Sequence, residues 1–201
     1  MNITNYFLSK AIILPALFFA ITFHELAHGL AAYIMGDDTA KDSGRLTLNP
    51  IAHIDIAGFL MLLIVGFGWA KPVPINPFKF KNRRLGTILV SIAGPATNIL
   101  LAIISAIVLT NVQVTNNIIY SILVSSIWYN VVLALFNLLP LPPLDGSKVL
   151  ASLLPQKLEY KFYKHERKLY GLLIIFILIN GVDGVLTPII YRVVNIIVLT
   201  V

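Results

Sequence analysis

The sequence contains no cysteine, and only 12% of its residues are charged. The lack of cysteine excludes disulfide frameworks, thiolate metal sites and a cysteine nucleophile, so any metal must be bound by His, Asp or Glu. Soluble domains carry about 25% charged and about 45–50% apolar residues, whereas 58% of these 201 residues are hydrophobic. One soluble core cannot bury that much apolar surface. The composition therefore predicts an integral membrane protein and excludes a disordered chain, a collagen-like fibre and a polar nucleic-acid module.

The charge is unbalanced, with 15 Lys and Arg against 9 Asp and Glu and a net charge of +6. A basic chain can indicate a nucleic-acid partner, but here the cations lie in short segments beside apolar runs, where they would meet anionic lipid headgroups. We therefore expect the lipid bilayer, and no nucleic acid, as a partner.

Three apolar runs predict transmembrane helices, at residues 7–35, 85–109 and 118–139. Each is long enough to cross about 30 Å of hydrocarbon at about 1.5 Å per residue. The first run could instead be a signal peptide, but it continues into further membrane-like sequence with no polar segment to export. It is therefore interpreted as a retained membrane helix.

Residues 44–75 do not fit a spanning helix. Apolar and polar side chains alternate briefly over residues 44–50, which end in Asn-Pro. This pattern suggests a strand and a turn. The apolar run at residues 56–70 is short, contains three glycines and ends in the turn-prone Lys71-Pro72-Val73-Pro74. We expect a small re-entrant, β-hairpin-like element, which is tolerated at membrane depth only where it packs on protein or lines a wet cavity.

The predicted fold class is thus an all-α polytopic membrane protein in one domain, residues 1–201. A core of three transmembrane helices covers about residues 7–150. Residues 165–201 form one or two further membrane helices, interrupted at Gly181-Val182-Asp183-Gly184. No internal repeat or long linker divides the chain.

The first predicted helix contains His24-Glu25-Leu26-Ala27-His28, an HExxH pattern. His24 and His28 lie one turn apart on the same face, so both imidazoles can bind one Zn²⁺, while Glu25 projects about 100° around the helix as a base. The alternative is a chance match or a His pair packed against polar partners. Burying three ionisable groups in about one turn of a membrane helix costs roughly a few kcal/mol each, so the segment must face an interior with partners or water.

A catalytic zinc site takes a third protein ligand and leaves the fourth position to water. The candidates near apolar sequence are His53, Asp55, Asp145 and Asp183. Asp145 follows a proline-rich stretch that prevents a regular helix and precedes a glycine, which suits a carboxylate turned back toward the helices. The residues alone leave this choice open.

Three motifs together resemble the site-2 protease family of intramembrane zinc metalloproteases: HExxH in the first membrane segment, Gly94-Pro95-Ala96-Thr97-Asn98 in the second, and Asn137 through Gly146 after the third. The resemblance covers about residues 20–150, and residues 44–58 also resemble a stretch of short bacterial members. It implies a short form without PDZ or CBS modules. Ser147-Lys148 departs from the Gly-Arg of many members, which weakens only inferences about the flanking loop.

The resemblance implies one Zn²⁺ per chain, with His24, His28 and Asp145 as ligands and Glu25 as catalytic base. The reaction implied is metalloendopeptidase hydrolysis of peptide bonds within or next to transmembrane segments, as in regulated intramembrane proteolysis. The substrate would be a membrane protein, whose unwound segment could pair with residues 44–48. The sequence gives no indication of the oligomeric state.

Four further polar residues are candidates around this site. The resemblance suggests that Asn137, and also Asn98, contact the substrate backbone or the developing oxyanion, although an Asn in a membrane helix also serves as interhelical glue. His53 and Asp55 are expected to line the site or to orient a ligand from behind it. The alternative for this pair is a satisfied loop contact.

Metal geometry and charge select one topology. If residues 56–70 crossed the bilayer, HExxH and Asp145 would emerge on opposite faces and could not share a metal. If they do not cross, residues 36–84 and 140–168 lie on the same side, with seven and six of the 15 cations. The positive-inside rule makes that side cytoplasmic, which predicts a multi-pass protein of a prokaryotic cell membrane with its site toward the cytosol.

Two other functions remain open. A divalent-cation transporter could use His24, His28 and Asp145 to carry its ion, and a non-catalytic protein could bind membrane segments without cutting them. Neither has a physical need for Glu25 beside the ligands.

Overall fold

The computed structural model describes residues 3–65 and 68–201. Within those ranges the chain forms helices and connecting segments, with no strand. In chain order the helices are α1 (Ile3–Ile34), α2 (Thr39–Asp42), η1 (Pro50–His53), α3 (Ile56–Val65), η2 (Pro77–Lys79), α4 (Arg83–Asn111), α5 (Asn117–Asn137), α6 (Asp145–Leu153), α7 (Gln156–Lys164), α8 (Glu166–Leu178), η3 (Val182–Leu186) and α9 (Thr187–Thr200).

In the part of the chain that the structure describes, four helical segments are long and apolar enough to cross a membrane: Ile13–Ile34, Arg83–Asn111, Asn117–Asn137 and Val182–Thr200. The predicted multi-pass helical protein is confirmed. Helix α8 has only 13 residues, about 20 Å at 1.5 Å per residue, which is short for a hydrocarbon core. The C-terminal region described here therefore contributes one candidate span.

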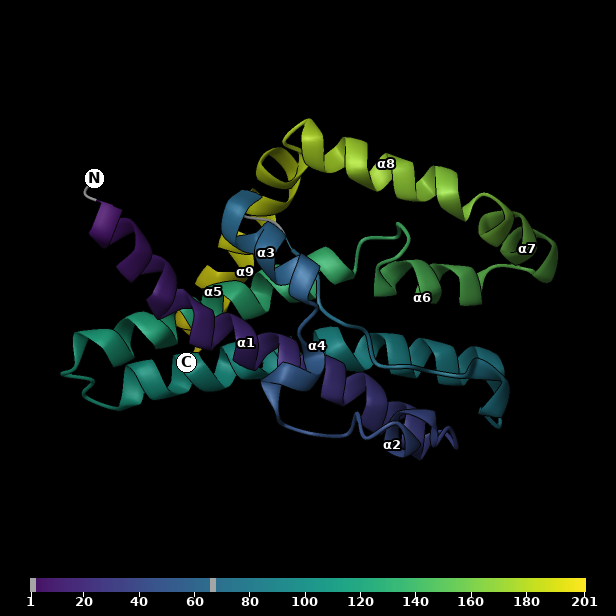
Figure 1. Ribbon diagram of the computed structural model, residues 1–201, viewed down its shortest axis with the longest axis horizontal. Helices are drawn as coiled ribbons and strands as arrows, with labels where there is room; N and C mark the ends of the chain where they lie inside the picture. Colours follow the sequence, from purple (N-terminus) through teal and green to yellow (C-terminus); the bar gives the residue numbers. More distant parts are fainter. Residues whose placement is uncertain (1–2, 66–67) are drawn as a thin grey trace.

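Helices α4 and α5 form an antiparallel pair, and α1 lies against both of them (Figure 1). Small side chains allow this close approach: Ala102 and Ala106 on α4 and Ala134 on α5 are completely buried. Helix α9 covers the other side of the pair, where Ile190 packs in the same buried cluster as Ala102 and Ala106. The outer faces of the helices keep large apolar side chains exposed, as lipid contact requires.

The β-hairpin predicted for residues 44–75 is wrong. The stretch Ile56–Val65 forms the ten-residue helix α3, because an unbroken apolar run without alternation can satisfy its backbone internally only as a helix. One isolated antiparallel bridge, Ile54 to Ala70, joins the two ends of the element. A Cβ on Gly58 would lie 2.1 Å from the Trp69 carbonyl oxygen, so the returning chain touches α3 directly. Residues 66–67 of the predicted element lie outside the described residues.

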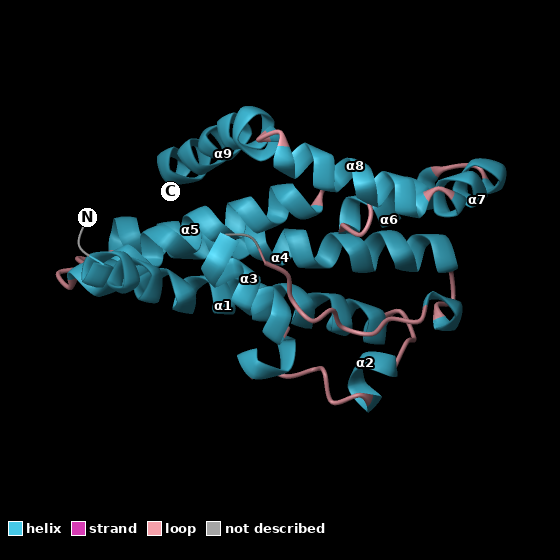
Figure 2. Ribbon diagram, turned by 45° about the horizontal axis from the view of Figure 1, so that its top comes forward, coloured by secondary structure: helices cyan, strands magenta, loops and turns pink. Residues whose placement is uncertain are grey.

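The chain then returns along α1 before α4 begins. Residues 71–76, which we call the strap, have no regular secondary structure and belong to the long loop that passes over α1 in Figure 2. Helix α2, the start of α4, α6 and α7 all lie toward one end of the bundle (Figure 1). The segments that directly follow α1 and α5 in the chain therefore lie at the same end of the bundle.

Candidate metal centre

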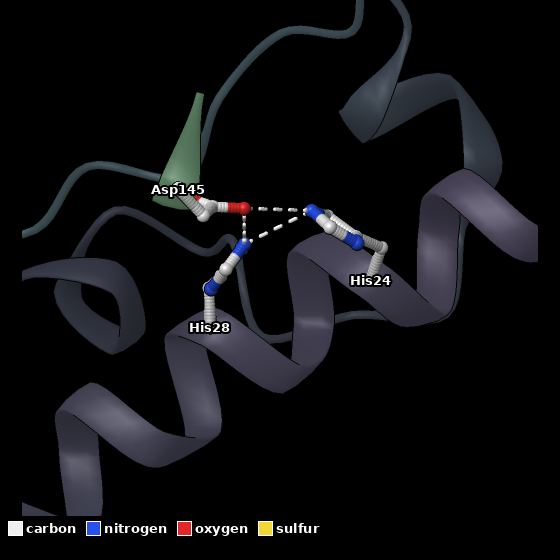
Figure 3. A group of neighbouring side chains, drawn as sticks. All are labelled: His24, His28 and Asp145. Carbon is white, nitrogen blue, oxygen red and sulfur yellow. Dashed lines mark hydrogen bonds and ion pairs between the residues drawn. The ribbon is translucent and has the colours of Figure 1, made fainter. Parts of the chain in front are cut away.

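Three buried side chains converge between α1 and α6 (Figure 3). Nε2 of His28 lies 3.0 Å from Nε2 of His24 and 3.0 Å from Oδ2 of Asp145, and Nε2 of His24 lies 3.3 Å from the same carboxylate oxygen. The two imidazoles are one turn apart on α1, and Asp145 is the first residue of α6. The structure thus brings together the three residues for which the sequence predicts metal binding.

The second nitrogen of each imidazole is occupied. Nδ1 of His24 donates to Oδ1 of Asn98 at 2.6 Å, and Nδ1 of His28 donates to the Val90 carbonyl at 2.7 Å. Because each neutral ring then carries its proton on Nδ1, both Nε2 lone pairs face the Asp145 carboxylate. Three buried electron-pair donors this close together repel one another unless a cation lies between them. Tetrahedral Zn²⁺ with ligands at about 2.0 Å separates those ligands by about 3.3 Å, so the donor set fits zinc.

Two glycines make room for this cluster. A Cβ on Gly94 of α4 would lie 2.5 Å from Nε2 of His28 and 2.7 Å from Cε1 of His24, so α4 passes the imidazoles as bare backbone. A Cβ on Gly146 would lie 2.2 Å from the Leu138 carbonyl oxygen, so the start of α6 packs directly on the end of α5. Gly94 is therefore a close-packing residue, and the surface that it packs against is the pair of imidazoles.

Asn98 lies behind His24 and has no exposed surface. Its Nδ2 donates to the Ala20 carbonyl at 3.1 Å and to Oδ1 of Asn130 at 2.8 Å, and Nδ2 of Asn130 donates to the Ser126 carbonyl at 2.9 Å. Sequence reasoning missed Asn130, although a lone Asn in the middle of an apolar span was a usable signal. These contacts connect α1, α4 and α5 behind the metal centre.

The other predicted polar residues make contacts elsewhere. Asn137 donates to the Leu133 carbonyl within α5. The buried ring of His53 donates from Nε2 to the Thr47 carbonyl, and Asp55 accepts from the Gly58 N–H at the start of α3. None of the hydrogen bonds or ion pairs recorded between described residues joins Asn137, His53 or Asp55 to the cluster.

Glu25 projects from α1 toward the strap. Its buried carboxylate accepts the Val73 main-chain N–H at 2.8 Å. Sequence reasoning could not find this partner, because a main-chain donor leaves no signature in a residue pattern.

A cavity of about 200 Å³ adjoins His28 and Asp145. Most of its wall is apolar and comes from the strap, η2 and α4. Besides His28 and Asp145, the lining residues are Val73, Ile75, Pro77, Phe80, Thr87, Val90, Ser91 and Lys148. The Lys148 ammonium lies 3.1 Å from Oδ1 of Asp145, on the carboxylate oxygen that faces away from the imidazoles. The cavity is therefore large enough for an apolar side chain next to the metal centre.

Comparison with known proteins places the chain among zinc metalloproteases by sequence. Residues 111–179 match the sequence profile of peptidase family M50. The chain is 45% identical over 167 residues to YwhC of Bacillus subtilis (strain 168), whose name includes the words zinc metalloprotease; the match covers 79% of this chain and 75% of YwhC.

Two more distant relatives also have zinc metalloprotease in their names. MJ0611 of Methanocaldococcus jannaschii is 31% identical over 64% of this chain and 63% of its own length. Rip2 of Mycolicibacterium smegmatis is 31% identical over 63% of this chain and 51% of its own length. No solved structure matches the chain.

Proposed function

Because the chain belongs to peptidase family M50, the site-2 protease family of zinc metalloproteases, we propose that it hydrolyses peptide bonds within or next to transmembrane segments of membrane proteins. The observation that carries the proposal is the convergence of His24, His28 and Asp145 within 3.3 Å of one another, with Glu25 next to them on α1. That set supplies three ligands and one base inside a bundle of apolar helices.

His24, His28 and Asp145 would hold Zn²⁺ and leave one position open to water. When bound, zinc would supply a Lewis acid that lowers the pKa of that water toward neutrality and polarises the scissile carbonyl. Glu25 takes the proton of the attacking water and passes it to the leaving amine nitrogen, so the peptide bond breaks into a free carboxylate and a free amine. Asn98 holds the His24 ring in the tautomer that keeps its Nε2 lone pair directed at the metal.

The substrate must present an unwound backbone, because the peptide bonds of a transmembrane helix are shielded by their own hydrogen bonds. Among the described residues, no hydrogen bond is recorded for the main-chain N–H or C=O of Ile75, in the strap beside the cavity. These groups can pair with the unwound segment. Pairing at residues 44–48 is not supported, because that segment is not a strand and its Thr47 carbonyl is bound by His53.

We assign the end of the bundle that holds the strap and α6 to the cytosolic side of a prokaryotic cell membrane. The residue ranges 36–84 and 140–168 contain 13 of the 15 cations, and α2, the start of α4, α6 and α7, which belong to these ranges, lie toward this end. Substrate would then reach the site from the cytosolic leaflet.

The test measures zinc content and cleavage of a reporter with a transmembrane segment, both on the full chain in proteoliposomes. Glu25→Gln should keep about one zinc per chain and lose cleavage, whereas Asp145→Ala should lose zinc. Undiminished cleavage by Glu25→Gln rejects the protease. Zinc flux into the vesicles without cleavage would favour a transporter.

A further inference from the structure

The strap is attached to α1 at the proposed catalytic base. Its Val73 N–H donates to Oε2 of Glu25, and the Val73 side chain is buried against α1. A Cβ on Gly29, one turn after Glu25, would lie 3.3 Å from Val73 Cγ1 and 2.6 Å from Leu46 Cδ2. The missing side chain at Gly29 therefore allows the strap to lie close enough for the hydrogen bond.

Arg45 holds the strap immediately before Val73. Nη2 of Arg45 donates to the Lys71 carbonyl at 2.7 Å, and Nη1 donates to the Pro72 carbonyl at 3.2 Å. The guanidinium is buried, and no carboxylate of the described residues lies within ion-pair distance of it. Burying a cation that binds only two main-chain carbonyls costs free energy of folding. The position of Arg45 is therefore better explained by a role in function than by packing alone.

Asp37 holds the strap after Val73. Its Oδ2 accepts the Asn76 N–H at 2.6 Å, and its Oδ1 accepts both the N–H and the hydroxyl of Thr39. Asp37 has no exposed surface. Asp37 and Arg45 flank the short helix α2, so one loop directly after α1 holds the strap on both sides of Val73.

We propose that Arg45 and Asp37 are positioning residues for catalysis, which hold the strap so that the Val73 amide orients the Glu25 carboxylate toward the attacking water. The inference rests on the proposed function, since it assigns a task to the surroundings of the base. A carboxylate on a flexible side chain reaches its working geometry only part of the time unless a fixed donor holds one oxygen. The Val73 N–H occupies Oε2 and leaves Oε1 for proton transfer.

The decisive variants remove the attachment and leave the metal ligands intact. Arg45→Met keeps the length of the side chain and deletes both donors, while Arg45→Lys keeps the charge and one donor. The matched control is Arg84→Met, because Arg84 also donates to a carbonyl, that of Leu154, but is exposed at the bundle end. Zinc content, kcat, KM and the unfolding temperature are measured for each full-length variant.

Arg45→Met should lower kcat about 100-fold, the cost of misplacing a catalytic group by about 1 Å, with KM within about threefold and zinc content unchanged. Arg45→Lys should recover part of kcat, and Arg84→Met should match the wild type. A kcat for Arg45→Met within about threefold of the control overturns the proposal. Loss of zinc together with activity also overturns it, since Arg45 would then support the metal centre.

A second variant tests the Val73 amide directly. Replacing Val73 by its α-hydroxy acid analogue turns the N–H into an ester oxygen and keeps the side chain, so it deletes the donor to Glu25. It also makes the Pro72 carbonyl a weaker acceptor for Nη1 of Arg45, while the Lys71 carbonyl keeps its bond to Nη2. It should lower kcat about as much as Arg45→Met, and the combined variant should lose less than about threefold more, because both changes act through one hydrogen bond. An unchanged kcat in the ester variant contradicts the proposal even if Arg45→Met does not fold. Where both variants fold, fully additive losses also contradict it.

Glu25→Gln in the same assay distinguishes a failure of the role proposed for the strap from a failure of the proposed protease function. If it is inactive while Arg45→Met and the ester variant are fully active, only the role of the strap is wrong. If Glu25→Gln cleaves normally, the proposed function itself fails.

Discussion

Gly94 and His28 are packed so closely that a Cβ on Gly94 would lie 2.5 Å from Nε2 of His28. A methyl group at this position occupies the space in which the lone pairs of His24 and His28 meet. Gly94 therefore does more than allow α4 to approach α1, because its lack of a side chain keeps open the space between the imidazoles that the proposed zinc ion would occupy.

Gly94→Ala should abolish zinc binding and cleavage together. The contact atoms belong to imidazoles held by Asn98 and the Val90 carbonyl, so they cannot move aside freely. Zinc stoichiometry of the purified full chain measures the effect. Gly171→Ala is the matched control, since a Cβ there meets nothing within 4 Å; equal zinc content in the two variants would contradict the prediction.

Asn98→Leu should weaken zinc binding by about 10–100-fold, the usual cost of losing a hydrogen-bonding partner behind a metal ligand. The substitution leaves Nδ1 of His24 and Oδ1 of Asn130 without their partner on Asn98. Competition with a chelator of known affinity measures the change. Asn111→Leu, on the exposed end of the same helix, is the control, and unchanged affinity in Asn98→Leu would show that the ring needs no such support.

The attachment of the strap by Asp37 should weaken in acid. Burial raises the pKa of the Asp37 carboxyl, but the hydrogen bonds from Thr39 and from the Asn76 N–H outweigh it and lower that pKa below its ordinary value. A lowered pKa in the folded state contributes stability that is present above the ordinary carboxyl pKa of about 3.9 and is lost as the pH falls through the folded-state pKa. Thermal unfolding should show this loss at acid pH in the wild type.

In Asp37→Asn the loss of folding stability in acid should be smaller than in the wild type, because the substituted side chain does not ionise. The comparison is the difference in unfolding temperature between pH 6 and the lowest pH at which the protein stays soluble. An equal difference in the two proteins would mean that Asp37 does not contribute to acid sensitivity.

Thr87→Phe should reduce cleavage without affecting zinc. Thr87 lines the cavity beside His28 and Asp145, and a phenyl group there fills space that an apolar substrate side chain needs. KM should rise at least several-fold, and substrates with small residues at the cleavage position should be affected least. Leu89→Phe, on an exposed position of the same helix, controls for added bulk, and an equal KM in both variants would exclude a substrate role for the cavity.

The apolar runs predicted the spanning helices well, because a segment in lipid must satisfy its own backbone and so forms a helix almost regardless of its neighbours. The same reasoning failed at residues 44–75. There the strand-like alternation of residues 44–50 was too short to specify pairing, and the packing of Gly58 on the returning chain at Trp69 favoured the short helix α3. Local patterns cannot report contacts of that kind.

For the site, HExxH placed His24 and His28 on one face of α1, since helical periodicity alone determines that relation. Spacing along the chain left the third ligand open, and only the packing of Gly146 against the end of α5 brings Asp145 to the imidazoles across 117 positions. The same is true of the hydrogen-bond partners behind the ligands and the base. Asn130, the Val90 carbonyl and the Val73 amide reach their positions only through the packing of α1, α4, α5 and the strap.

The sequence by itself therefore determined the membrane environment, the helical class, the HExxH face and the family resemblance, all of which follow from composition, periodicity or local motif. The tertiary structure alone decided which carboxylate meets the imidazoles, what holds each ring, and how the strap reaches Glu25. These relations depend on close approach between segments far apart in the chain, and at Gly29, Gly94 and Gly146 that approach is possible because no side chain stands in the way.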